Sequence, residues 1–263
     1  MIKTVKILIV LILITMCFIG FAFAEKEKLI FATHPFPPFK YVAENGDIVG
    51  CDVEIVKQIV TRLGYDFKIK SLPFQRALFN VSKGKMTGYI SFTKNPERLK
   101  TYYFSSPIST IKDVFFKQKK NDINWDKLDD LKEYRVDYTK NYNYAPVFLD
   151  AIKQNKFQPV YIIGSEEAEV KHLERISKGF VDLAICEISV CSFLIKQHKS
   201  KFVNVDFINK AIGPVRTFHV GFSRKWPGIK EFVEKFNADL AKFVTEGKRK
   251  AIFEKYGVIT YLD

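Results

Sequence analysis

The stretch SFTKNPERLKTYYFSSP (91–107) carries the side chains best suited to hold an anion. Arg98 ends in a planar guanidinium with five N–H donors, which match the two oxygens of a carboxylate. Ser91 and Thr93 precede it at the end of a predicted strand, and their hydroxyls can add hydrogen bonds. Two interpretations are open from these residues alone. Either they form a carboxylate-binding site, or they form a loop in which Arg98 pairs with Glu97 or with an acid elsewhere.

A site at a strand end needs a sheet behind it, and the chain contains alternating strand and helix patterns. Residues 28–33, 67–72 and 88–92 have strand patterns, whereas residues 51–65 and 74–84 have helical ones. This alternation predicts a largely parallel sheet with helices on its faces.

The alternation begins again after residue 120, and Ser165 is expected to cap a helix in SEEAEVKHLERISKG. A last strand near residues 219–225 and two amphipathic helices separated around Gly247 are expected to return to the first unit. Two α/β units joined near residues 110–120 would then be connected by two crossings that form a hinge. Binding sites in open α/β sheets lie at the carboxyl ends of strands, here on both sides of a cleft.

The N-terminus predicts secretion. Residues 1–24 have a short basic start, an unbroken apolar run and Ala22-Phe23-Ala24 at the end, which is typical of a signal peptide cleaved after Ala24. A retained membrane anchor is the alternative. Met16 before Cys17 does not suit a lipoprotein cleavage site, so we expect a free periplasmic protein.

The net charge of the chain bears on whether the protein binds nucleic acid. Loss of two lysines with residues 1–24 lowers the formal charge from +13 to +11, but the remaining lysines are scattered without a nucleic-acid motif. We therefore expect a basic surface and no nucleic-acid partner.

Three cysteines follow residue 24, namely Cys51, Cys186 and Cys191. Because the number is odd, at least one must be a free thiol or pair between molecules. We expect three small buried residues and no bridge between Cys186 and Cys191.

Motifs for metal or nucleophilic chemistry are missing from the sequence. The four histidines are dispersed, and there is no phosphate loop, nucleophile elbow or Ser-His-Asp ordering. We expect no metal and no cofactor.

Three stretches carry a family resemblance: FPPFKYVAENGDIVGCDVEIVKQIVTRLGY, GKMTGYISFTKNPERLKTYYFSSPI and GFVDLAICEISV. In this order they resemble the periplasmic solute-binding proteins of the polar amino acid ABC transporter type, bacterial extracellular solute-binding family 3. The resemblance covers essentially the whole chain after residue 24. It implies the type II periplasmic-binding-protein fold, in which two α/β lobes joined by a two-stranded hinge close on a ligand. Lobe 1 would comprise residues 25–114 and 218–263, and lobe 2 residues 115–217.

The resemblance assigns ligand contacts in lobe 1. Arg98 matches the arginine that holds the ligand carboxylate, and Ser91 and Thr93 match hydroxyl and main-chain contacts. Phe36 matches an aromatic residue that stacks on the ligand, although packing in a Pro-rich loop is the alternative, and Phe39 is expected in the core. Arg76 is either a second anion-binding group or a solvated helix residue.

The resemblance also assigns contacts in lobe 2, where the chain departs from the family. Glu187 stands where the family usually has an aspartate for the ligand ammonium. Tyr142 and Asn143 occupy a turn that often has glycine and threonine in the family. Asp137 occupies a position at which the family often has a glycine. Thr33 replaces the acid of cationic amino acid binders, so a polar, aromatic or acidic ligand is expected.

The implied function is capture of a small polar solute, an amino acid or related carboxylate, for an inner-membrane ABC permease. The protein would be a monomer and not an enzyme. Two alternatives stay open. One is a cleft enzyme of the dehydratase or lyase type with Glu187 as general acid, because an enclosed glutamate can have a raised pKa. The other is a ligand-sensing module for a membrane receptor.

Overall fold

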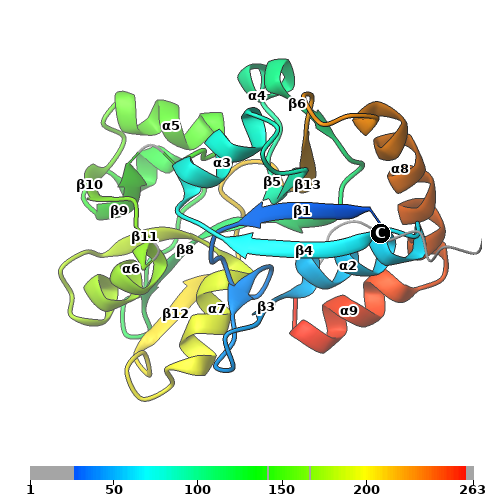
Figure 1. Ribbon diagram of the computed structural model, residues 1–263. Helices are drawn as coiled ribbons and strands as arrows, with labels where there is room; N and C mark the ends of the chain where they lie inside the picture. The colour runs from blue at the N-terminus through cyan, green and yellow to red at the C-terminus, as the bar shows by residue number, and fades with distance from the viewer. Residues whose placement is uncertain (1–26, 141, 166, 259–263) are drawn as a thin grey trace, which may run out of the picture.

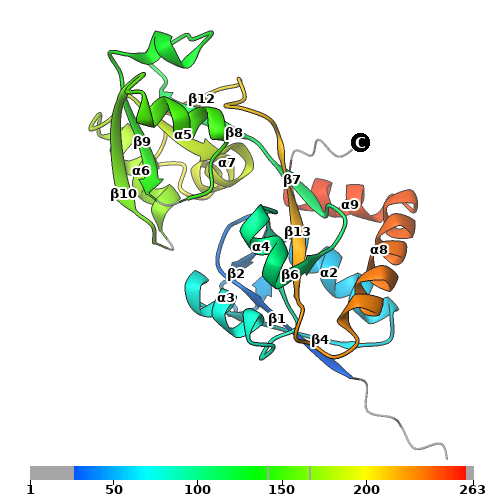
Figure 2. The same ribbon diagram turned by 90° about the horizontal axis from the view of Figure 1, so that it is seen from above.

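Two separate β-sheets divide the chain into two lobes (Figures 1 and 2). The computed structural model describes residues 27–140, 142–165 and 167–258, and the predicted signal peptide lies outside these residues. The predicted two-lobed α/β architecture is confirmed. None of the described helices is long and apolar enough to cross a membrane.

The first sheet has the order β4-β1-β5-β13-β6, and β7 also pairs with β13. β1 is parallel to β4 and β5, whereas β13 is antiparallel to its neighbours. Its strands are β1 (Lys28–Thr33), β4 (Asp66–Ser71), β5 (Gly88–Phe92), β6 (Tyr102–Phe104), β7 (Ser109–Ile111) and β13 (Arg216–Ser223). A small hairpin pairs β2 (Tyr41–Val42) with β3 (Ile48–Val49). The helices of this lobe are α2 (Cys51–Arg62), α3 (Phe74–Ser82), α4 (Pro96–Thr101), α8 (Ile229–Thr245) and α9 (Lys248–Tyr256).

The C-terminal helices complete the core of the first lobe. Figure 1 shows α8 and α9, in orange and red, beside α2, and both helices contact it. Phe232 and Phe236 of α8 pack against Phe222 of β13 with ring centroids 5.6 and 5.4 Å apart. Burial of each such side chain contributes about 1.5–3 kcal/mol, so the lobe depends on chain segments from both ends of the sequence.

The second sheet has the order β10-β9-β11-β8-β12. Its strands are β8 (Asp113–Gln118), β9 (Arg135–Lys140), β10 (Gln158–Ile163), β11 (Leu183–Glu187) and β12 (Val205–Ile208). The helices are α5 (Pro146–Lys153), α6 (Ala168–Ser177) and α7 (Ile188–Gln197), and a 3-10 turn, η1 (Leu128–Leu131), precedes β9.

Both sheets are largely parallel, as the alternation predicted, but each contains one strand that runs against the others. β8 is antiparallel to β11 and β12, just as β13 is antiparallel to β5. Each of these two strands enters its sheet from the other lobe, at the edge where the parallel strands end. A strand that enters at that edge must run in the opposite direction.

The hinge consists of two chain crossings. β7 leads out of the first lobe and pairs with returning β13, with Thr110 opposite Thr217 (Figure 2). Our expected lobe boundaries, at residues 114/115 and 217/218, fall inside β8 and β13.

Lobe 2 contains a disulfide that we did not expect from the sequence. Cys186 and Cys191 form a disulfide with their Cα atoms 6.3 Å apart, so the expectation of no bridge is wrong. β11 ends at Glu187 and α7 begins at Ile188, and this immediate strand-to-helix turn brings the two sulfurs together. Cys51 is the free thiol that the odd number of cysteines requires, and it is buried.

Candidate ligand-binding site

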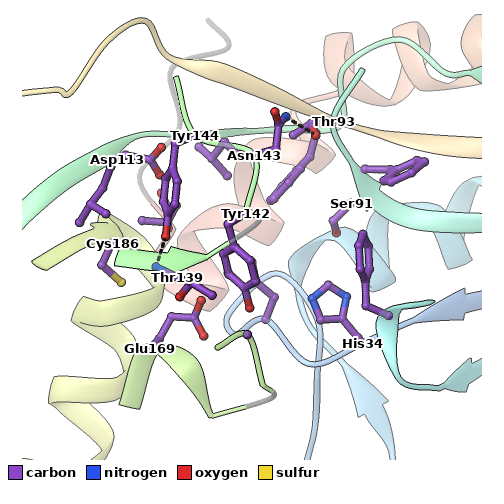
Figure 3. A pocket seen from close by; sticks show the side chains of 18 of the residues that line it. His34, Ser91, Thr93, Asp113, Thr139, Tyr142, Asn143, Tyr144, Glu169 and Cys186 are labelled. Atoms are coloured by element: carbon purple, nitrogen blue, oxygen red, sulfur yellow. Dashed lines mark hydrogen bonds between the residues drawn. The ribbon is translucent and has the colours of Figure 1, made fainter. Parts of the chain in front are cut away.

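A cavity of about 530 Å³ lies between the lobes, a volume typical of small-molecule sites. Residues of both lobes and of the hinge strands line it, and Figure 3 shows many of their side chains pointing into it. The lining residues used below are His34, Phe36, Lys40, Phe74, Gln75, Ser91, Thr93, Arg98, Asp113, Thr139, Lys140, Tyr142, Asn143, Glu169, His172, Glu187 and Arg216.

Arg98 is held in the cleft by uncharged groups. It lies in α4, whose N-cap Asn95 accepts from the Arg98 backbone N–H at 2.7 Å. Its Nη1 donates to the backbone oxygen and Oγ1 of Thr93 at 2.8 and 2.5 Å, and its guanidinium lies 4.0 Å over the Phe92 ring. Burial lowers the pKa of Arg98.

Arg98 forms no ion pair with the residues that the structure describes. Glu97 pairs instead with Lys100 at 2.9 Å, and within the described residues no carboxylate lies within ion-pair distance of Arg98. Its Nε and Nη2 carry no hydrogen bond to any described residue. These atoms are therefore positioned to bind an anion from outside the protein.

Ser91 supports the site mainly through its backbone. Its φ of 58° lies in the left-handed region, which costs a non-glycine residue roughly 1–2 kcal/mol. Its hydroxyl donates to Asp52 Oδ2 at 2.6 Å, and Ser109 of β7 donates to the same oxygen at 2.9 Å. The Ser91 hydroxyl therefore has only its acceptor lone pairs left for a ligand.

A buried charge network beneath Ser91 was not predicted from the sequence. Asp52 is 0% exposed and Lys40 is 1% exposed. Lys40 Nζ donates to the backbone oxygens of Ile90 and Ser91 at 2.9 and 3.4 Å, and to the Tyr89 hydroxyl at 3.3 Å. Burial raises the pKa of Asp52 to about 6 and lowers that of Lys40 to about 7. Asp52 lies in the first turn of α2, where an acidic residue is stabilised by the helix dipole. From the sequence alone, this helix position is sufficient to account for an acid there, and nothing indicates a buried network.

Glu187 lies at the junction of β11 and α7 and is 5% exposed. Its Oε2 accepts from the Val190 backbone N–H at 2.9 Å, and its Oε1 accepts from the Lys112 N–H at 3.2 Å. Burial raises the pKa of Glu187 to about 8, with a further contribution from the charge of Asp113. Asp113 itself pairs with Arg216 of the other hinge strand.

The turn after β9 reaches across the cleft. Asn143 Nδ2 donates to Thr93 Oγ1 at 3.3 Å, and Arg216 donates to the Asn143 backbone oxygen. The Tyr144 hydroxyl accepts from the Thr139 backbone N–H at 2.9 Å, which closes the turn on its own strand.

Of the predicted site residues, the cavity brings together Phe36, Ser91, Thr93, Arg98, Tyr142, Asn143 and Glu187. Arg76 is exposed on α3 and does not line the cavity, although Phe74 and Gln75 beside it do. The helical rotation between successive residues turns Arg76 away. Phe36 lines the cavity and also packs against Phe39, with ring centroids 6.1 Å apart. Phe39 is fully buried, as expected.

Lobe 2 adds a buried polar cluster that no sequence motif indicated. His172 Nδ1 is hydrogen bonded to Asp137 Oδ2 and its Nε2 to Thr139 Oγ1, both at 2.8 Å. Arg175 Nε lies 3.1 Å from the same Asp137 oxygen. Asp137 and His172 are 35 residues apart in the chain, so only the fold pairs them. Among the described residues there is no group of three or more His, Cys, Asp or Glu residues able to hold a metal ion.

Residues 29–259 match the family of bacterial extracellular solute-binding proteins, family 3. The chain belongs to this family. The arginine-binding extracellular protein ArtP of Bacillus subtilis is 26% identical over 239 residues, which are 88% of this chain and 86% of that relative. The probable ABC transporter arginine-binding protein ArtJ of Chlamydia trachomatis is 22% identical over 179 residues. That match spans 66% of this chain and 65% of ArtJ, slightly less than two thirds of its length.

A solved structure of an ancestral arginine-binding protein bound to arginine has a TM-score of 0.71 at 23% identity. It covers 88% of this chain and 99% of its own. At this identity the likeness concerns the fold, and the family membership makes the protein a solute-binding protein.

Proposed function

We propose that this protein is the periplasmic binding component of an ABC transporter and captures an amino acid or a closely related carboxylate. The observation that carries the proposal is the state of Arg98. It is a partly buried cation, held by Thr93 and Phe92, with no protein carboxylate to pair with among the described residues. A desolvated cation is costly unless an anion reaches it, and a ligand carboxylate supplies that anion.

The ligand carboxylate would bind Nε and Nη2 of Arg98. Each charge-assisted hydrogen bond contributes about 1.5–3 kcal/mol in a site shielded from water. The α-ammonium would bind Glu187, whose oxygens keep lone pairs beyond the two backbone N–H groups they accept. A bound ammonium favours the ionised carboxylate and offsets the effect of burial.

Cleft closure follows from this division of contacts. The open form would bind ligand on lobe 1, and closure would add Glu187 and the Tyr142–Asn143 turn from lobe 2. A micromolar dissociation constant corresponds to about −8 kcal/mol, which two charged contacts and aromatic burial supply after ordering costs.

The relatives support this ligand class and these partners, since they are named for arginine binding and one as part of an ABC transporter. We propose a signal peptide cleaved after Ala24, periplasmic location, an inner-membrane permease as partner, a monomeric protein and no nucleic-acid ligand.

A thermal-shift screen of the purified protein against amino acids and small carboxylates tests the proposal. Arg98→Ala should abolish stabilisation by the ligand, whereas Arg76→Ala, which removes an exposed arginine outside the cleft, should retain it. Stabilisation only by compounds without a carboxylate would refute the assignment.

Catalysis is a second candidate because the raised pKa of Glu187, about 8, suits a general acid. Incubation of the protein with each stabilising ligand, followed by mass spectrometry, distinguishes the two. Recovery of unchanged ligand supports binding alone, and Glu187-dependent loss of water or ammonia from the ligand supports the enzyme. A sensing role would use the same cleft with a receptor in place of the permease, and affinity capture from membranes separates these partners.

A further inference from the structure

The carboxylate of Glu169 is a feature of the cleft that the family resemblance does not explain. Glu169 lies in the first turn of α6, which begins two residues later than an N-cap at Ser165 led us to expect. It is half-buried, lines the cavity, and points into it near the hydroxyl of Tyr142 (Figure 3). Throughout the described residues, no side chain forms a hydrogen bond or ion pair with it. It accepts a hydrogen bond from its own backbone N–H, and the charge of His172 on the same helix also acts on it.

The other charged side chains of the cleft already have protein partners. Lysine and arginine cations there contact oxygens or an aromatic ring, and the carboxylates accept from a guanidinium or from backbone N–H groups. These partnered groups are Lys40, Asp113, Lys140, Glu187 and Arg216. Arg98 keeps its Nε and Nη2 without a hydrogen bond to any described residue, because only its Nη1 donates to Thr93. Glu169 receives no hydrogen bond from a side chain among the described residues. A ligand that balances both must carry an anion and a cation.

The surroundings of Glu169 also favour a cation. The aromatic rings of Tyr142, His34 and Phe74 line the same cavity, and the His34 and Phe74 rings lie 5.2 Å apart. Aromatic faces attract ammonium and guanidinium groups. Burial lowers the pKa of His34 well below its usual value, so its ring adds no competing positive charge.

We propose that Glu169 recognises a positively charged group at the far end of the ligand side chain, so that the cleft selects amino acids with a guanidinium or ammonium side chain over neutral isosteres. This inference rests on the proposed function, because Arg98 must hold the α-carboxylate. It differs from our expectation of a polar, aromatic or acidic ligand, which was based on Thr33 in lobe 1. The acid that recognises the side chain comes from lobe 2 instead.

Calorimetric titration with matched ligand pairs tests the inference. L-arginine is compared with L-citrulline, in which a neutral urea of the same shape replaces the guanidinium. L-lysine is compared with L-norleucine, which lacks the terminal ammonium. The wild-type protein should bind the cationic member at least about ten-fold more tightly, the ratio expected for one charge-assisted hydrogen bond. Glu169→Gln should bring both ratios close to one, because the cationic members lose the charge that favours them.

Glu167→Gln is the matched control, since Glu167 is the exposed N-cap of the same helix and does not line the cavity. It should keep the wild-type ratios. Equal affinities within both pairs for the wild-type protein, or a preference that survives in Glu169→Gln, would overturn the role of Glu169 while leaving amino acid binding intact. Failure of every amino acid to bind would overturn the proposed function together with the inference.

Discussion

Asn143 and Thr93 join the two lobes by a hydrogen bond across the ligand cleft, with Asn143 Nδ2 3.3 Å from Thr93 Oγ1. Thr93 Oγ1 also accepts from Arg98. The residue that positions the proposed carboxylate-binding arginine is thus also the residue that the other lobe contacts. We therefore expect ligand capture to be coupled to closure of the cleft.

Removal of this contact should weaken ligand binding through faster release. Asn143→Ala should cost about 1 kcal/mol of the closed form, or roughly five-fold in Kd, because a neutral hydrogen bond contributes about that much. Stopped-flow or surface-plasmon measurements would show the change in the dissociation rate. Thr93→Val should cost more, since Arg98 also loses a partner, whereas Thr93→Ser should stay near wild type. Equal affinities for the Val and Ser variants would contradict the coupling.

Glu187 should make the stability of the unliganded protein fall as pH rises. Its folded pKa of about 8 lies above its ordinary value of 4.5, so the folded state binds a proton that the unfolded state has already lost between these values. The stabilising contribution is therefore complete below pH 4.5 and is lost as pH rises toward 8.

Urea denaturation at pH 5 and pH 8 measures this contribution. Glu187→Gln cannot titrate and should show a smaller loss of unfolding free energy between the two pH values than the wild-type protein. Groups that do not interact with Glu187 titrate equally in both proteins, so the difference between them reports Glu187 together with its neighbour Asp113. Parallel pH profiles for the two proteins would exclude the raised pKa.

The Asp52 network should contribute strongly to stability. Asp52→Ala leaves the donors of Ser91 and Ser109 without their acceptor and removes the nearby charge that favours the ammonium form of buried Lys40. We expect a loss of roughly 3 kcal/mol in the free energy of unfolding. Ser109→Ala keeps Asp52 and its other donor, so it should cost only about 1 kcal/mol. Chemical denaturation of both variants provides the measurement, and equal losses would argue against a shared acceptor.

The disulfide between Cys186 and Cys191 should stabilise the turn that presents Glu187. Replacing both cysteines by serine should lower the unfolding free energy by about 2 kcal/mol, as expected for so short a loop. A reductant should lower the melting temperature of the wild-type protein toward that of the double variant and leave the variant unchanged. Equal effects of the reductant on both proteins would show that the bond is not the cause.

Local sequence patterns were enough to predict the succession of strands and helices and the residues around Arg98, because periodicity and short spacings are local properties. Ser91, Thr93 and Arg98 lie within eight positions, so the end of one strand and the start of one helix suffice to bring them together. The secretion signal could likewise be predicted from composition, although it lies outside the described residues.

Contacts between distant groups, by contrast, become visible in the tertiary structure alone. Asp52 contacts Ser91 and Ser109, Asn143 contacts Thr93, and Asp137 contacts His172. These pairs are 35 to 57 residues apart in the chain, and no periodicity encodes them. The face on which a side chain lies is also a tertiary property, and for this reason Arg76 is outside the cleft and Glu169 is inside it. Burial then sets the chemistry, because removal of water gives Asp52, Lys40 and Glu187 pKa values that their residue types alone do not predict.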